Sequence, residues 1–211
     1  AHYLCWQQGQ LDVQRYWSPP LTVEWSMQDN MTVRSEMREQ LSMAVEERLM
    51  SDVPLGAYLS GGVDSSIVVG LMGQVLDSPV RTYSIGFDES DGIHPKFNQD
   101  LNHAKMVSGH FGTDHCPVVM DSSDSLAELA ERVIVQLDEP LANPTALPTY
   151  LVARQARSDG IKVLLSGDGG DELFGGYTRY MADLWVSRYR NVPAILRQKA
   201  ISPLLRSIST S

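Results

Sequence analysis

The sequence is poor in lysine, and its charge balance is acidic. Four lysines occur among 211 residues, and the formal net charge is −9 at pH 7. A protein that binds long nucleic acid normally carries a basic surface, because contacts to phosphates supply most of its affinity. The composition therefore speaks against DNA or RNA as a partner, but it is compatible with a nucleotide that brings its own Mg²⁺.

Cysteine and long apolar runs are also scarce. The two cysteines, Cys5 and Cys116, lie far apart in the sequence, which favours two free thiols in a reducing compartment over a structural disulfide. No stretch approaches the roughly 20 apolar residues of a membrane helix, and the first residues lack the basic segment and apolar run of a signal peptide. These absences predict a cytoplasmic protein without a membrane partner.

Apolar strand-like segments alternate with helix-like segments along most of the chain. After a short strand pair within residues 1–20, the expected strands are Leu55–Leu59, Val80–Phe87, Asp114–Met120 and Ile161–Leu165. The expected helices are Val33–Met50, Asp64–Val75, Asp100–Phe111, Ser122–Leu137, a segment ending near Ser158, one after the last strand, Trp185–Tyr189 and Ala194–Ile208. This alternation predicts an α/β fold with a doubly wound, mainly parallel sheet and helices on both faces.

The first of these strands runs into a glycine-rich turn, Ser60-Gly61-Gly62-Val63-Asp64-Ser65-Ser66. Glycines allow a tight turn with inward-pointing N–H groups, and the following helix adds its positive end, so the turn is suited to an anion. It lacks the lysine of a Walker A motif. Asp64 would repel a bound phosphate unless a cation lay between them, which predicts Asp64 as an Mg²⁺ ligand. The alternative is a plain turn in which Asp64 and the serines act as helix caps.

A second glycine-rich turn, Ser166–Tyr177, follows the last apolar strand and carries Asp168, Asp171 and Glu172. The carboxyl ends of parallel strands meet at one edge of a sheet, where open α/β folds bind ligands. We therefore expect Asp64 and Asp171 to lie around one metal–pyrophosphate group. A merely solvated acidic loop is the alternative, and the ligand spacing of an EF-hand calcium loop is absent.

Together the two turns resemble a known family. Residues 60–66 are similar to the SGGxDS signature of the ATP-pyrophosphatase (PP-loop) superfamily, and the pair resembles the synthetase domain of class B, glutamine-hydrolysing asparagine synthetases. The similarity runs from about Val33 to Met181. It includes residues 81–87, 111–115, 138–140 and 147–150. The resemblance implies the adenine nucleotide alpha hydrolase-like fold.

The resemblance also implies a domain organisation. Residues 33–211 correspond to the synthetase domain, truncated at its C-terminal end. Residues 1–20 look like the tail of an absent N-terminal glutaminase domain, and residues 21–32 like a linker. The isolated chain is therefore expected to lack parts of the complete catalyst.

Site roles follow from the same resemblance. Asp64 and Asp171 match the carboxylates that hold Mg²⁺ and pyrophosphate, and Asp168 falls where many members carry a catalytic glutamate. These three are the candidate catalytic residues. The candidate ATP-binding residues are Leu59, Ser60, Gly61, Gly62, Asp64, Ser65, Ser66, Ile85, Ser166 and Gly167. Asp100 matches an acid near the site, but an ordinary helix N-cap is at least as strongly expected for it. Tyr177 either lines the site or packs.

The implied function is ATP-dependent amidation of a carboxylate through an acyl-adenylate, with release of AMP and pyrophosphate. Aspartate is the expected substrate, and ammonia would come from glutamine through the glutaminase domain. The alternatives are a related amidotransferase acting on another carboxylate, a different PP-loop enzyme that modifies tRNA or forms GMP or NAD, and a non-catalytic nucleotide-binding fragment. The acidic balance and the second turn speak against the tRNA-, GMP- or NAD-type enzyme. An oligomer is compatible with the sequence.

Overall fold

The structure is a computed structural model that describes residues 1–19, 29–87, 98–120, 126–138, 143, 145–193 and 197. Three expected features lie wholly or largely outside the described residues. They are most of the linker, residues 139–140 of the segments that resemble the family, and the helix Ala194–Ile208, of which only Arg197 is described. The chain divides into two compact units, Ala1–Leu41 and Ser42–Ser211. Among the helices of the described part, none is long and apolar enough to cross a membrane.

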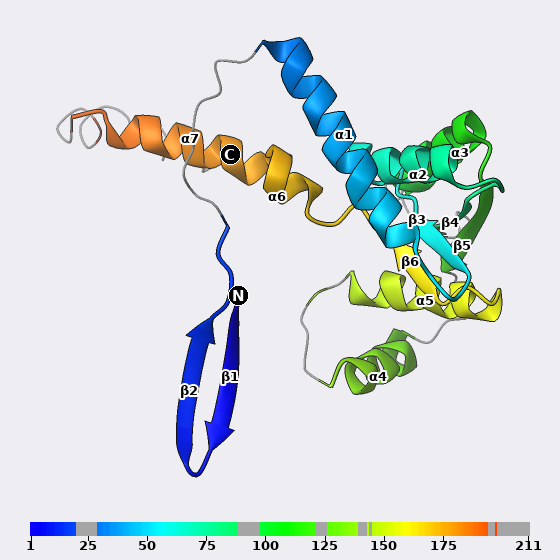
Figure 1. The fold of residues 1–211 in the computed structure, drawn as a ribbon, viewed down its shortest axis with the longest axis horizontal. Helices are drawn as coiled ribbons and strands as arrows, with labels where there is room; N and C mark the ends of the chain where they lie inside the picture. The colour runs from blue at the N-terminus through cyan, green and yellow to red at the C-terminus, as the bar shows by residue number, and fades with distance from the viewer. Residues whose placement is uncertain are drawn as a thin grey trace, which may run out of the picture. The chain divides into compact units, whose positions relative to one another are not determined.

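The first unit begins with the expected strand pair. Strands β1 (His2–Gln7) and β2 (Gln10–Arg15) form an antiparallel hairpin (Figure 1). Leu4 pairs with Val13 and Trp6 with Leu11, so the apolar side chains stand on one face of the hairpin.

Helix α1 (Asn30–Leu49) begins three residues earlier than expected, so the last residues of the expected linker are helical. The cause is Asp29, whose Oδ1 accepts hydrogen bonds from the backbone N–H groups of Met31 at 2.8 Å and Thr32 at 2.9 Å. A side-chain acceptor at this position satisfies the free N–H groups of the first turn and fixes the start of a helix.

The second unit contains the predicted parallel sheet. Its strands are β3 (Leu55–Tyr58), β4 (Arg81–Phe87), β5 (Asp114–Met120) and β6 (Val163–Leu165). They lie in the order β5-β4-β3-β6, and every neighbouring pair is parallel. The chain moves outward from β3 to β5 and then returns to the other side of β3, so the strand order reverses between β3 and β6. Open α/β sheets bind their ligands at such a reversal.

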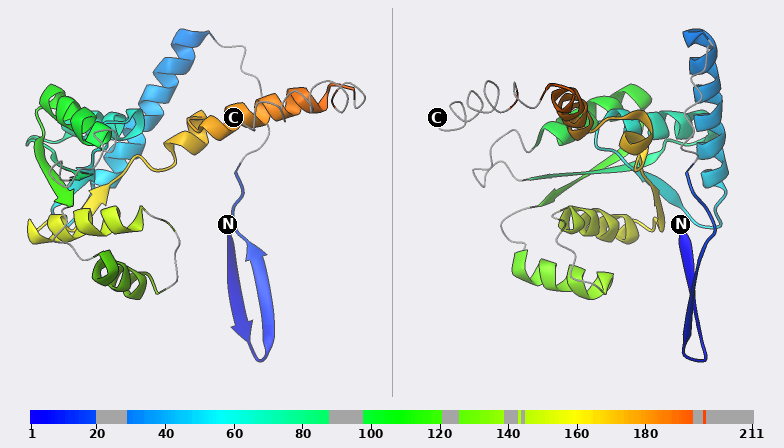
Figure 2. Two further views of the ribbon diagram at one scale, coloured as in Figure 1. Left: turned by 180° about the vertical axis from the view of Figure 1, so that it is seen from behind. Right: turned by 90° about the vertical axis from the view of Figure 1, so that its left-hand side faces the viewer.

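Helices cover both faces of the sheet, as expected for a doubly wound fold (Figures 1 and 2). Helices α2 (Val63–Val75) and α3 (Gln99–Phe111) connect the outward-moving strands and cover one face. Helices α4 (Leu126–Leu137) and α5 (Ala146–Ser158) lie in the return connection; α5 covers the other face, and α4 packs against α5. Two further helices, α6 (Gly170–Phe174) and α7 (Thr178–Arg190), follow β6.

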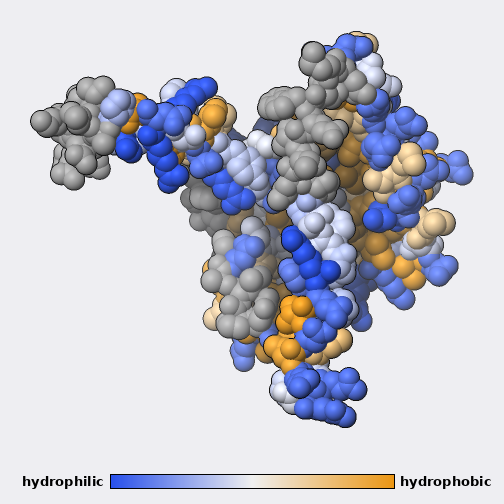
Figure 3. Space-filling model, turned by 60° about the vertical axis from the view of Figure 1, so that its left-hand side comes forward, coloured by the Kyte–Doolittle hydropathy of each residue, from blue (hydrophilic) through white to orange (hydrophobic). Residues whose placement is uncertain are grey.

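The core of this unit lies between the sheet and its helices. Tyr83 on β4 is fully buried and forms a cluster with Val152 and Ala156 of α5. Met72 and Val69 of α2 are also fully buried. On the face seen in Figure 3, hydrophilic residues make up most of the surface and hydrophobic residues are scattered among them.

A cluster of charged groups ties the end of α5 to the amino ends of two strands. The Arg81 guanidinium lies 2.6 Å from Asp159 and 2.7 Å from Asp114, and the Tyr83 hydroxyl donates to Asp159 at 2.9 Å. These bonds lower the pKa of Asp159, with the Arg81 bond the main cause, and they raise the pKa of Arg81. Because α5 is held at this end, its other end is positioned over the carboxyl edge of the sheet.

A buried chain of hydroxyl groups surrounds His115 on the opposite face. Its Nδ1 lies 3.0 Å from the Thr82 hydroxyl and its Nε2 lies 3.1 Å from the Ser84 hydroxyl. Thr113 continues the chain to Thr82 at 2.9 Å. Burial lowers the pKa of His115, and the nearby charges of Lys105 and Arg81 lower it further. The imidazole is therefore held neutral, and such a network is stable only while all its members are satisfied.

This histidine gives the fold a pH dependence. A folded-state pKa below the unfolded value of about 6.5 means that the unfolded chain binds the proton more readily. Stability should therefore be complete above about pH 6.5 and fall as the pH drops through the lowered pKa. Urea unfolding from pH 8 to 5.5 should show this slope in the wild type and lose it in His115→Gln. His110→Gln, on the exposed side of α3, should keep the slope; equal slopes in the wild type and His115→Gln would contradict the prediction.

Candidate functional site

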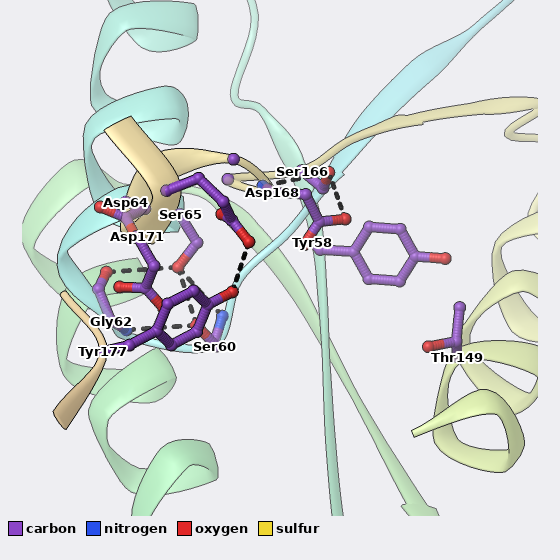
Figure 4. Close-up of a pocket in the computed structure, with 13 residues that line it drawn as sticks. Tyr58, Ser60, Gly62, Asp64, Ser65, Thr149, Ser166, Asp168, Asp171 and Tyr177 are labelled. Atoms are coloured by element: carbon purple, nitrogen blue, oxygen red, sulfur yellow. Dashed lines mark hydrogen bonds between the residues drawn. The ribbon is translucent and has the colours of Figure 1, made fainter. Parts of the chain in front are cut away.

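The loops after β3 and β6 lie side by side because these strands are hydrogen-bonded neighbours, with Ala57 paired to Leu165. They enclose a cavity of about 330 Å³ at the carboxyl edge of the sheet (Figure 4). Its lining residues are Tyr58, Ser60, Gly62, Asp64, Ser65, Thr149, Ser166, Gly167, Asp168, Gly169, Asp171, Glu172 and Tyr177. The two glycine-rich turns therefore converge on one cavity, as predicted.

The serines of the first loop bind the loop itself. The Ser60 and Ser65 hydroxyls lie 3.0 Å apart, the Ser60 N–H donates to Ser65 Oγ at 3.3 Å, and the Gly62 N–H donates to Ser60 Oγ at 3.2 Å. The Ser66 hydroxyl donates to the Gly62 carbonyl at 2.6 Å. Gly62 is the N-cap of α2 and has no side-chain cap bond. The serines thus order the turn, whereas Asp64 is not a cap and its carboxylate is left for another partner.

The second loop rests directly on Asp64. A Cβ atom at Gly167 would lie 2.7 Å from the Ser65 backbone nitrogen, and one at Gly170 would collide with the Asp64 carboxylate. Close approach to backbone atoms therefore requires glycine at position 167, whereas a side chain at position 170 would displace the Asp64 carboxylate. This contact brings Asp171, in the first turn of α6, beside Asp64 on the same wall of the cavity (Figure 4).

The cavity is strongly acidic. Four carboxylates line it, from Asp64, Asp168, Asp171 and Glu172, and none of its lining residues is basic. The Ser166 hydroxyl donates to Asp168 at 3.0 Å. The Tyr177 hydroxyl donates to Glu172 at 2.6 Å, which lowers the pKa of Glu172 and raises that of Tyr177.

Asp64 and Asp171 are the carboxylates available to a metal. Neither accepts a hydrogen bond from a residue that the structure describes. Within the described ranges, no group of three or more His, Cys, Asp or Glu residues is arranged to hold a metal ion. Two carboxylates are, however, what Mg²⁺ uses when phosphates and water complete its shell. The donor set therefore fits a metal that arrives with a phosphate ligand.

A second cavity, of about 320 Å³, adjoins the first on the α5 side of the sheet. Its lining residues are Tyr58, Leu59, Ser60, Tyr83, Ser84, Ile85, Phe87, Asp100, Thr145, Pro148, Thr149 and Val152. A mainly apolar wall with a few hydroxyl groups suits a flat heterocycle with polar edges. The two cavities share Tyr58, Ser60 and Thr149.

Most of the candidate residues line one of these cavities. The acidic cavity contains Ser60, Gly62, Asp64, Ser65, Ser166, Gly167, Asp168 and Asp171, and the second contains Leu59, Ser60 and Ile85. Gly61 and Ser66 line neither: Gly61 faces the backbone of α3 at His103 and Ala104, and Ser66 is bound within α2. Their place in the binding motif stays a prediction.

The positions of Asp100 and Tyr177 in the structure decide between the two roles that the sequence left open for each of them. Asp100 lines the second cavity and is not a cap, because the N-cap of α3 is Asn98. The Asn98 side chain is itself bound to the backbone N–H and carbonyl of Phe87, each at 2.8 Å. Tyr177 lines the acidic cavity.

Sequence reasoning missed several lining residues, notably Tyr58, Thr145 and Thr149, and it noted Glu172 in the second turn without giving it a role. Tyr58 carried a usable signal, since it is the last residue of a strand that ends at the loop. The helix α5 residues carried little, because the sequence does not tell which turn of a helix approaches a strand end.

The fold is an α/β architecture, a doubly wound parallel sheet whose two glycine-rich loops meet at the strand reversal. The sequence pattern of one family, described as asparagine synthase, matches residues 36–210. The chain therefore belongs to the asparagine synthase family.

Named relatives agree with this assignment. The chain is 34% identical over 163 residues to asparagine synthetase [glutamine-hydrolyzing] 1 of Bacillus subtilis, covering 77% of this chain and 24% of the relative. It is 36% identical over 187 residues to putative asparagine synthetase [glutamine-hydrolyzing] 2 of Methanocaldococcus jannaschii, covering 88% and 35%. The chain thus spans about a quarter to a third of the length of these relatives.

A solved structure, the NH3-dependent NAD synthetase of Campylobacter jejuni, overlaps with a TM-score of 0.43 and 17% identity, over 69% of this chain and 62% of that chain. A likeness of this size has no bearing on the site.

The close contact between the two loops can be tested by adding one methyl group. Gly167→Ala would force its Cβ against the Ser65 backbone, so we expect a loss of about 1–3 kcal/mol in the free energy of unfolding. Gly73→Ala is the matched control, because Gly73 lies within helix α2 with nothing near its Cβ position. It should gain about 0.5–1 kcal/mol from helix propensity. Urea unfolding measures both, and an equally stable Gly167→Ala variant would contradict the contact.

Proposed function

We propose that this chain binds Mg²⁺-ATP and activates a carboxylate by adenylylation, as the synthetase part of a glutamine-dependent amidating enzyme. Aspartate is the proposed acceptor and asparagine the product. Ammonia would come from glutamine, through a glutaminase domain in the full-length protein. The observation that carries the proposal is the convergence of Asp64 and Asp171, from two different loops, on one acidic cavity.

The two cavities suit the two ends of ATP. The acidic one has loop backbone and free carboxylates for a polyphosphate that carries Mg²⁺, held by Asp64 and Asp171. The other offers Leu59, Ile85 and Val152 to the adenine ring. When bound, Mg²⁺ supplies neutralisation of the charge that builds up on the departing pyrophosphate.

The chemistry consists of two displacements. A carboxylate oxygen of the acceptor attacks the α-phosphorus, the bond to the β-phosphate oxygen breaks, and pyrophosphate leaves. Ammonia then attacks the carbonyl carbon of the acyl-adenylate; the acyl–oxygen bond breaks, AMP leaves, and the nitrogen loses a proton to water. The loops lower the barrier by holding the reactants in position and by offering fixed N–H dipoles to the phosphates.

Asp168 is the proposed residue beside the acyl group. It follows Ser166, which fixes one of its carboxylate oxygens by a hydrogen bond and leaves the other for a partner. An acid here can accept a hydrogen bond from incoming ammonia and orient it. Glu172 also has one carboxylate oxygen bound within the same turn, by Tyr177, so the choice of Asp168 rests on its match to the family's catalytic acid.

Removing either metal-binding carboxylate tests the proposal. Asp64→Asn and Asp171→Asn should each weaken Mg²⁺-dependent ATP binding roughly ten- to a hundred-fold, because a neutral amide is a poor ligand for this cation. Asp77→Asn, an exposed position beyond the end of α2, is the matched control and should bind like the wild type. Calorimetric titration with ATP, with and without Mg²⁺, measures the effect. Binding that is indifferent to Mg²⁺ and to both variants would refute the shared metal site.

The acceptor is identified by ATP–pyrophosphate exchange. The full-length protein that contains this chain should exchange labelled pyrophosphate into ATP when aspartate is present, because adenylylation is reversible before ammonia arrives. Asp168→Asn should leave exchange largely intact and impair amide formation. Exchange supported only by another acid would assign a related amidotransferase, and no exchange with any acid would leave a nucleotide-binding part without adenylylating activity.

A further inference from the structure

Three residues form the passage between the two cavities: Tyr58, Ser60 and Thr149, which line both. Ser60 belongs to the loop that is already assigned to ATP. Tyr58, on β3, and Thr149, on α5, have no assigned role. They approach the passage from the sheet and from the helix that covers it (Figure 4).

We propose that the Tyr58 hydroxyl donates a hydrogen bond to the α-phosphate of ATP, and to the same phosphate of the acyl-adenylate, in a passage that Thr149 closes from the opposite side. The inference rests on the proposed function and deepens it. ATP has one phosphate between adenosine and pyrophosphate. A nucleotide with its base in one cavity and its metal-bound pyrophosphate in the other must therefore place the α-phosphate where the cavities join.

Tyr58 has the position and the free donor for this contact. It is the last residue of β3, and its ring packs against the cluster of Tyr83, Val152 and Ala156. Packing on one side holds the ring in place, as a preorganised donor requires. Its hydroxyl makes no hydrogen bond to any residue in the described part of the chain. Burial, and to a lesser degree Asp168, raise the pKa of Tyr58, so the hydroxyl keeps its proton at neutral pH.

A neutral donor is also the type of side chain that this passage requires. The acidic cavity has no basic lining residue, so hydroxyl groups are the side-chain donors left for a phosphate oxygen. Those of Ser60 and Ser65 are bonded to each other within their loop. The Tyr58 hydroxyl is unbonded and stands outside that loop.

Thr149 acts through its size. Its hydroxyl donates to the Thr145 carbonyl at 2.8 Å, one turn earlier in α5, so its donor is already used. The side chain is otherwise exposed and forms the α5 side of the passage. A larger residue there would narrow the passage without disturbing the core, because Thr149 does not pack inside it.

The test compares four ligands on the full 211-residue chain: Mg²⁺-ATP, AMP, adenosine and Mg²⁺-pyrophosphate. Tyr58→Phe removes one oxygen atom, so it should weaken ATP and AMP about ten-fold, the usual size for one hydrogen bond to a charged group. Adenosine and pyrophosphate, which lack the α-phosphate, should bind as before. Tyr150→Phe is the matched control: Tyr150 is adjacent to Thr149 on α5 and lines neither cavity, so it should leave all four affinities unchanged.

Thr149→Trp provides a second, independent variant. By filling the passage it should abolish ATP binding while Mg²⁺-pyrophosphate still binds in the acidic cavity. Urea unfolding of each variant confirms that a loss of binding is not a loss of fold.

Each outcome has a definite meaning. If Tyr58→Phe weakens adenosine as much as ATP, the ring contacts the nucleoside and the proposal is wrong. If it weakens pyrophosphate instead, the hydroxyl faces the leaving group, and if it weakens nothing, there is no contact; both results also overturn the proposal. A wild-type chain that binds neither ATP nor pyrophosphate would refute the proposed function itself, whereas binding that is lost in Asp64→Asn but kept in Tyr58→Phe would refute this inference alone.

Discussion

The backbone contact between the two glycine-rich loops is the constraint on which the site depends. Strands β3 and β6 are paired at the point where the strand order reverses, so the chain leaves both strands at the same edge. The second loop can then rest on Asp64 only because Gly167 and Gly170 have no side chain. That contact fixes the direction of Asp64 and brings Asp171 beside it. The acidic cavity thus follows from the strand order and from the presence of glycine at these two positions.

Much of this arrangement could be predicted from the sequence, because the signals are local. The four strands of the sheet are apolar runs bounded by glycine, proline or polar residues, and their expected bounds differ from the observed ones by at most two residues. The ligand site could be predicted from the loop sequences alone, because glycines and acidic residues directly after a strand are typical of such sites. Parallel order then places the two loops at one edge.

The missed features have either a weak local signal or contacts between distant segments. The start of α1 was placed too late because its cap, Asp29, lies in a polar stretch that gives no periodic signal. The role of Asp100 stayed open because the sequence does not show that Asn98 is occupied by the backbone of Phe87. Tyr58 and Thr149 line the same passage only because α5 crosses the end of β3. The position of a helix over a strand depends on the packing of the whole fold, so it could not be predicted from the sequence of either segment.

The acidic cavity has a cost that its ligand offsets. Four carboxylates that line one small space repel one another, and the cavity supplies no basic side chain to balance them. Hydrogen bonds relieve Asp168 and Glu172, but Asp64 and Asp171 have no such partner among the described residues. A ligand that brings its own cation removes this repulsion and stabilises the folded chain through its binding free energy, whereas a bare polyphosphate adds to the repulsion. The charge of the cavity therefore favours the proposed metal-bound nucleotide over a bare one, and in that proposal hydroxyl groups recognise the remaining phosphate without adding a cation that would compete with the metal.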